Sequence, residues 1–152
     1  ITNDSKRKKF AFIKFDLKNR FKKMSPLKSM SLLKKITIYF MGSAYIYVGI
    51  RHFVDPDFFL AIMPDYLPMH LEAVYVSGIL EILLGGMLFF KKLRWFAGWG
   101  LIALLIAVFP ANIYLAHNET AQQAIEISQT AAIVRLPFQA LFIALAYWHT
   151  KN

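Results

Sequence analysis

Four long apolar stretches constrain this chain more than any other feature of its sequence. They cover residues 36–53, 73–90, 95–116 and 131–148. Each approaches the roughly 20 residues that a helix needs to cross the hydrocarbon core of a bilayer. Soluble helices carry a polar stripe, whereas LIALLIAVF at residues 101–109 has no polar residue on any face. The sequence therefore predicts an all-α integral membrane protein, and its short connections favour an antiparallel four-helix bundle.

The basic residues are concentrated at one end of the chain. Residues 1–35 hold twelve basic and two acidic side chains, whereas the remaining residues hold six basic and seven acidic ones. A nucleic-acid-binding domain would spread its positive charge over its fold. We therefore expect membrane lipids, and no nucleic acid, among the partners of this protein.

The connections between the stretches differ in charge, which predicts the topology. Lys91, Lys92 and Arg94 fill the connection between the second and third stretches, and further lysines precede the first. The other two connections contain no Lys or Arg, and they carry Asp55, Asp57, Asp65, Glu72, Glu119 and Glu126. Because cytoplasmic loops keep the positive charge, both termini are predicted to be cytoplasmic and the acidic connections external.

The sequence divides into a leader, residues 1–30, and a four-span transmembrane domain, residues 31–152. Phe10, Ile13, Leu17 and Phe21 recur at helical spacing among the basic residues of the leader. This pattern favours a basic amphipathic helix on the anionic inner leaflet, and a disordered leader is the alternative. No small-residue cleavage site follows an apolar core here, so a signal peptide is not expected.

Small and polar residues recur on one face of two predicted helices. Ser77, Glu81 and Gly85 follow one another at intervals of four residues in the second stretch. The first stretch has a comparable stripe made of Gly42, Tyr45, Gly49 and His52. Membrane helices approach each other closely through Gly and Ser, so these stripes predict helix contacts.

Six polar side chains in or beside the stretches form the predicted ligand-binding site. Charged groups in hydrocarbon are costly unless paired, which makes them candidates for function. A rise of 1.5 Å per residue places all six in the outer half of the membrane, so a polar path across the bilayer is not expected. The six residues are Arg51, His52, Glu81, Asn112, Arg135 and Gln139. No catalytic residue is assigned among them.

Glu81 allows two interpretations of this set. Its carboxyl would be neutral if isolated and ionised if Arg51 or Arg135 reached it. One interpretation is a buried ion pair that fixes the helix register. The other is an outward-opening ligand pocket, because two cations, an imidazole and two amides exceed what one ion pair needs.

Metal binding is not expected. The chain has no Cys, and its His and acidic residues lack the spacing of metal ligands. A haem held by His52 and His117 is disfavoured because His117 lies where its stretch ends.

The connection after the first stretch is rich in proline. Pro56, Pro64 and Pro68 punctuate it, and this pattern favours rigid turns in a re-entrant or interfacial lid. The apolar face of this lid is predicted to consist of Phe58, Phe59, Ile62 and Met63.

Four segments, in order, carry a resemblance to a known family. They read GIRHFVDPDFFLAIMPDYLP after the first stretch, YVSGILEILLGG in the second, FPANIYLA at the end of the third and RLPFQ at the start of the fourth. Over residues 36–150 the chain resembles the DoxX-like family of small four-helix membrane proteins.

The resemblance implies an accessory subunit of a membrane oxidoreductase, multi-pass in a bacterial inner (plasma) membrane. Its outward-facing pocket would take a quinone-like or anionic small molecule, and a quinone is the one cofactor that the resemblance suggests. A protein partner or a second copy of the chain is expected beside it. The alternative is an assembly or stabilising factor for other membrane proteins. Whether the chain catalyses a reaction is left open.

Overall fold

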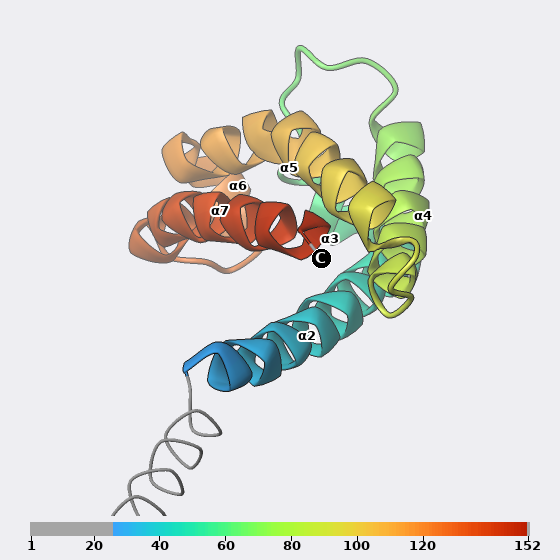
Figure 1. The fold of residues 1–152 in the computed structure, drawn as a ribbon. Helices are drawn as coiled ribbons and strands as arrows, with labels where there is room; N and C mark the ends of the chain where they lie inside the picture. Colours follow the sequence, from blue (N-terminus) through green and yellow to red (C-terminus); the bar gives the residue numbers. More distant parts are fainter. Residues whose placement is uncertain (1–25, 152) are drawn as a thin grey trace, which may run out of the picture. The chain divides into compact units, whose positions relative to one another are not determined.

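The computed structural model describes residues 26–151, with side chains from residue 32 onward. All regular structure in this part of the chain is helical, which confirms the predicted all-α class (Figure 1). The chain divides into two units, residues 1–36 and 37–152. The packing described below lies within the second unit. Residues 1–25, on which most of the predicted leader falls, lie outside the described residues.

Three of the described helices are long and apolar enough to cross a membrane: α4, α5 and α7. The first apolar stretch lies inside a fourth long helix, α2, whose role as a span remains a prediction. In chain order the helices are α2 (Pro26–Val54), α3 (Pro56–Leu60), α4 (His70–Leu88), α5 (Arg94–His117), α6 (Glu119–Ala124) and α7 (Gln129–Thr150).

Glycines bring α2 and α4 into close contact. A Cβ added to Gly49 would lie 2.7 Å from the carbonyl oxygen of Gly78, and one added to Gly42 would lie 2.9 Å from that of Gly85. The pairs run in opposite directions along the two helices, so the helices are antiparallel. The small-residue stripes of the sequence predict this contact, which only a residue without a side chain permits.

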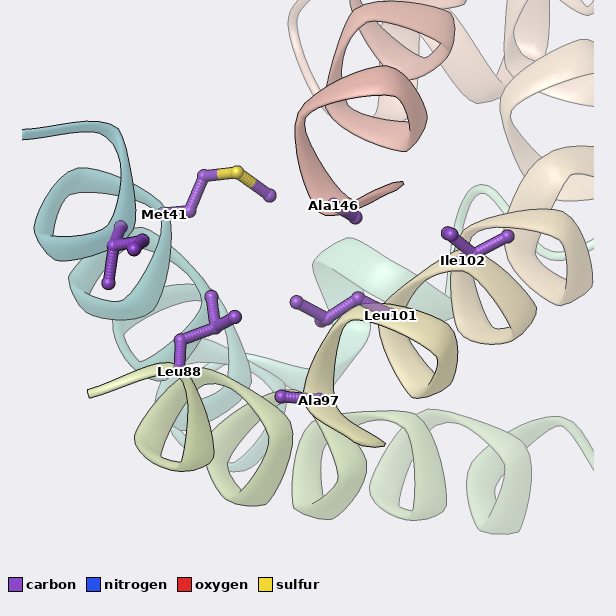
Figure 2. Close-up of a cluster of buried hydrophobic side chains, with 7 residues drawn as sticks. Met41, Leu88, Ala97, Leu101, Ile102 and Ala146 are labelled. Atoms are coloured by element: carbon purple, nitrogen blue, oxygen red, sulfur yellow. The ribbon is translucent and has the colours of Figure 1, made fainter. Parts of the chain in front are cut away.

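Apolar side chains join α2, α4, α5 and α7 on the side of the basic connection. Met41, Leu88, Leu101 and Ala146, one from each helix, belong to one buried cluster (Figure 2). Arg94 closes the turn between α4 and α5, because its Nε atom donates to the Leu88 carbonyl at 2.8 Å. This cluster fills the end of the second unit at which the basic connection lies.

α5 and α7 pack against each other (Figure 1). Hydrogen bonds of polar side chains stabilise the connection between these two helices. The carbonyls at the C-terminus of α5 lack helical partners. Gln122 of α6 is buried and donates to two of them, those of Leu115 at 2.9 Å and Ala116 at 3.3 Å. Ser128 then caps α7 by accepting the Ala131 N–H at 3.3 Å. The last helix therefore begins at Gln129, two residues before the predicted start of its apolar stretch.

Candidate ligand-binding site

A cavity of about 590 Å³ lies between α2, α4, α5 and α7 and is covered by the segment that contains α3. Its volume falls in the range of small-molecule sites, about 300–1,000 Å³. Most of its wall is apolar. The apolar wall includes Val48, Phe59, Ile62, Met63, Val74, Leu80, Leu104, Val108, Phe138 and Phe142.

Five of the six residues predicted to bind a ligand line this one cavity. They come from all four long helices: His52 from α2, Glu81 from α4, Asn112 from α5, and Arg135 and Gln139 from α7. Residues far apart in the sequence therefore share one apolar chamber. Whether they bind a ligand there stays a prediction.

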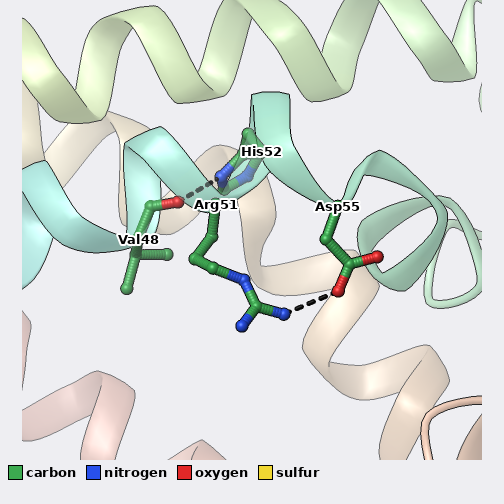
Figure 3. A network of polar contacts seen from close by, with 4 residues as sticks. All are labelled: Val48, Arg51, His52 and Asp55. Carbon is green, nitrogen blue, oxygen red and sulfur yellow. Dashed lines mark hydrogen bonds and ion pairs between the residues drawn. The ribbon is translucent and has the colours of Figure 1, made fainter.

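Arg51 is not among the residues that line the cavity. Its Nη2 atom forms an ion pair with Asp55 Oδ2 at 2.6 Å, one helical turn further along the chain (Figure 3). The two side chains are 40% and 41% exposed. Arg51 therefore has a carboxylate partner other than Glu81, at the end of α2.

The ring of His52 is fixed by two contacts. Its Nδ1 atom donates to the Val48 carbonyl oxygen at 2.9 Å, since a carbonyl can only accept a hydrogen bond (Figure 3). Phe59 of α3 stacks on the ring, with centroids 3.6 Å apart. These contacts hold a buried imidazole, 5% exposed, at the cavity wall.

Glu81 lies beside this imidazole at ion-pair distance, which counts as an ion pair only when His52 is protonated, and no hydrogen bond joins the two side chains. Glu81 Oε2 is 3.6 Å from His52 Nδ1 and has no hydrogen-bond partner among residues 26–151. The approach depends on the glycines, because Gly78, one turn before Glu81 on α4, lies against His52 Cβ. The site thus contains a carboxyl group, 8% exposed, with an unsatisfied oxygen.

Two amide side chains in the cavity wall, one from α5 and one from α7, are hydrogen-bonded to each other. Asn112 Nδ2 donates to Gln139 Oε1 at 2.9 Å, and Gln139 Nε2 donates to the Leu105 carbonyl. Pro110 lies inside α5 nearby and has no N–H, so the carbonyl four residues before it lacks its helical donor. Gln139 ties α7 to α5 through these two bonds.

Arg135 is the cationic group of the cavity. It is partly buried on α7, one turn before Gln139. Among the side chains that the structure describes, no carboxylate lies within ion-pair distance of it. The structure therefore shows no pairing of Arg135 with Glu81, and the cavity holds a cation and a carboxyl group that do not bond each other.

Several apolar wall residues were not predicted from the sequence. Tyr45 and Phe142, whose ring centroids lie 6.4 Å apart, contribute to the cavity wall from α2 and α7. Phe138 and Phe142 follow Arg135 at helical intervals of three and seven residues. That spacing was the available signal that one face of α7 lines the cavity.

The segment after α2 covers the cavity with apolar residues. Phe59, Ile62 and Met63 of the predicted lid line it, together with Leu67 and Pro68. His70, at the start of α4, is hydrogen-bonded to the Pro64 carbonyl at 3.0 Å and fixes the end of the segment. Within residues 26–151 no group of three or more His, Asp or Glu side chains could hold a metal ion.

Residues 41–150 match the model of the family described as "Domain of unknown function (DUF8561)". The chain belongs to this family. The matched region begins inside α2 and includes every residue that lines the cavity. No curated protein and no solved structure matches the sequence.

Proposed function

We propose that this protein is an integral membrane protein that binds a small lipid-soluble molecule in the cavity between α2, α4, α5 and α7. One observation carries the proposal: five polar residues from four helices converge on an apolar chamber of about 590 Å³. An apolar wall with a few convergent polar groups is the usual composition of a small-molecule site.

The exposed surface of the helices supports a membrane location. Large apolar side chains on α5 and α7 face outward, among them Trp95, Phe96, Ile106 and Leu141. Water would make such a surface prone to aggregation, whereas lipid tails solvate it. We include α2 as a fourth span, because it packs antiparallel on α4 through Gly42 and Gly49.

The charged connections support an outward-facing cavity. Lys91, Lys92 and Arg94 lie at the end of the second unit opposite the cavity, beside the cluster of Leu88 and Leu101. The acidic connections lie at the cavity end. By the positive-inside rule, both termini are cytoplasmic and the cavity is in the outer half of a bundle of four antiparallel spans.

Arg135 defines the chemistry of the ligand. Arg135 has no carboxylate partner among the side chains that the structure describes, and such a guanidinium group favours an anionic or carbonyl oxygen. The apolar wall favours a hydrocarbon or ring system attached to it. A quinone-like molecule and an amphipathic anion both meet these requirements.

The resemblance to the DoxX-like family extends the proposal to a physiological role. We assign the protein as an accessory subunit that holds such a molecule for a partner oxidoreductase in a bacterial inner membrane. Recovery of a stoichiometric protein partner without any small molecule would favour the alternative, an assembly factor.

Ligand retention tests the binding function. The purified protein would be extracted with organic solvent and its small molecules quantified by mass spectrometry. Ala111→Phe fills the cavity from α5, whereas Ala103→Phe adds the same ring on an exposed face of α5 outside the cavity. We expect a stoichiometric molecule with the wild type and Ala103→Phe, and its loss with Ala111→Phe. Equal contents in all three proteins would contradict the proposal.

A further inference from the structure

The Glu81 carboxyl group is a specific, unsatisfied feature of the cavity wall. Its Oε2 atom is buried and has no hydrogen-bond partner among the described residues, in a side chain that is 8% exposed. Buried polar atoms are nearly always hydrogen-bonded in native proteins, and each exception calls for an explanation. Because Glu81 lines the ligand cavity, rotation of its carboxyl group about the Cγ–Cδ bond would let a group that arrives with the ligand supply the missing bond.

Two of the polar groups near Glu81, on α2 and α4, are engaged elsewhere. His52 Nδ1 faces Oε2 at 3.6 Å but directs its hydrogen to the Val48 carbonyl. Ser77, one turn before Glu81 on α4, donates its hydroxyl to the Val74 carbonyl at 2.9 Å. Neither side chain can satisfy the carboxyl group without breaking a bond that it already makes.

A hydroxyl group is the partner that suits this carboxyl group in either protonation state. It donates to a carboxylate and accepts from a carboxylic acid, whereas an ammonium group can only donate. Arg135 in the same cavity also disfavours a second cation. On the proposed ligand-binding function, we infer that the ligand carries a hydroxyl group that hydrogen-bonds to Glu81, in addition to the oxygen that Arg135 holds.

A matched pair of probes tests this inference. Binding of 12-hydroxydodecanoate and of dodecanoate to the full chain in lipid nanodiscs would be measured by calorimetry. Both acids offer a carboxylate to Arg135, and only the first offers a hydroxyl group. We expect the hydroxylated acid to bind about tenfold more tightly, the ratio that one good hydrogen bond supplies.

Two variants locate the effect. Glu81→Leu should remove the advantage of the hydroxylated acid and retain the binding of dodecanoate. Ser77→Ala, which removes a hydroxyl group from the same face of α4, should leave the advantage unchanged. If Glu81→Leu does not fold, Glu81→Met replaces it. The comparison of the two acids on the wild-type protein tests the inference without any variant.

The outcomes separate this inference from the proposed function. Equal binding of the two acids to the wild type, or an advantage that persists in Glu81→Leu, overturns the hydroxyl inference and leaves the ligand site standing. If neither acid binds and Ala111→Phe has the same small-molecule content as the wild type, the ligand site and this inference both fail.

Discussion

His52 Nδ1 lies 3.6 Å from Glu81 Oε2, while the same nitrogen donates its hydrogen to the Val48 carbonyl at 2.9 Å. The carboxyl group is thus held beside an imidazole that forms no hydrogen bond with it. In a buried ion-pair network the cation would hydrogen-bond the carboxylate directly. This geometry favours the ligand-pocket interpretation over the register-fixing pair.

Replacement of Glu81 distinguishes the ligand pocket from the register-fixing ion pair, because the two interpretations predict different losses of stability. Glu81→Gln should change the free energy of unfolding by less than about 1 kcal/mol, because no arginine among the described residues depends on this charge. Thermal unfolding in detergent provides the measurement. Loss of a buried pair would instead cost about 3–5 kcal/mol.

A double-mutant cycle serves as the control for this result. Glu81→Gln and Arg135→Met should have additive effects on stability, within about 0.5 kcal/mol. A larger coupling energy would show that the two charges pair, and the account of the site would be wrong.

The contact between α2 and α4 should be sensitive to a single methyl group. In Gly49→Ala the new Cβ would lie 2.7 Å from both the Gly78 carbonyl oxygen and Ile82 Cγ1. The helices must separate, at a cost of about 1–3 kcal/mol measured by thermal unfolding. Gly86→Ala is the matched control, since nothing lies within 4 Å of its added Cβ. That variant should be neutral or more stable, and a fall as large as that of Gly49→Ala would refute the close contact.

Gln139 should contribute more to stability than an exposed glutamine. Gln139→Leu leaves the Leu105 carbonyl and the Asn112 amide without their partner, which should destabilise the protein by about 1–3 kcal/mol. Gln123→Leu removes an exposed glutamine of α6 and should stay within about 0.5 kcal/mol of the wild type. Equal melting temperatures for the two variants would show that the amide pair does not join α5 and α7.

Cysteine labelling tests the proposed orientation, and the chain offers no native thiol background. In sealed, right-side-out cells an impermeant maleimide should label Asp65→Cys, in the external acidic connection. It should leave Lys92→Cys unlabelled, because the basic connection faces the cytoplasm. The opposite pattern would invert the topology and place the cavity in the inner half of the membrane.

The sequence predicts the helices and most of the polar site for identifiable reasons. Long apolar stretches leave few alternatives to helices, and ionisable residues within them are rare enough to mark a site. Glu81 and Arg135 stand out in this way. The glycine stripes likewise predict the face on which α2 and α4 meet, because close helix approach requires small residues.

Other features depend on three-dimensional contacts that the pattern does not encode. Asp55 lies in the predicted connection, just beyond the end of α2, and the chain continues the helical turn there far enough to bring its carboxylate to Arg51. The role of Phe142 cannot be separated from that of other apolar residues, since aromatic residues face lipid and cavity alike, whereas Tyr45 lies on the predicted stripe that contains His52. The position of His52 depends on a hydrogen bond to a backbone carbonyl, which any residue at position 48 would provide.

A density map of the purified protein in lipid nanodiscs tests the central claim most directly. We predict non-protein density of elongated shape in the cavity, with one end in contact with the Arg135 guanidinium group and the rest against the apolar wall. A cavity without such density, in which Arg135 turns to form an ion pair with Glu81, would contradict the proposed ligand site.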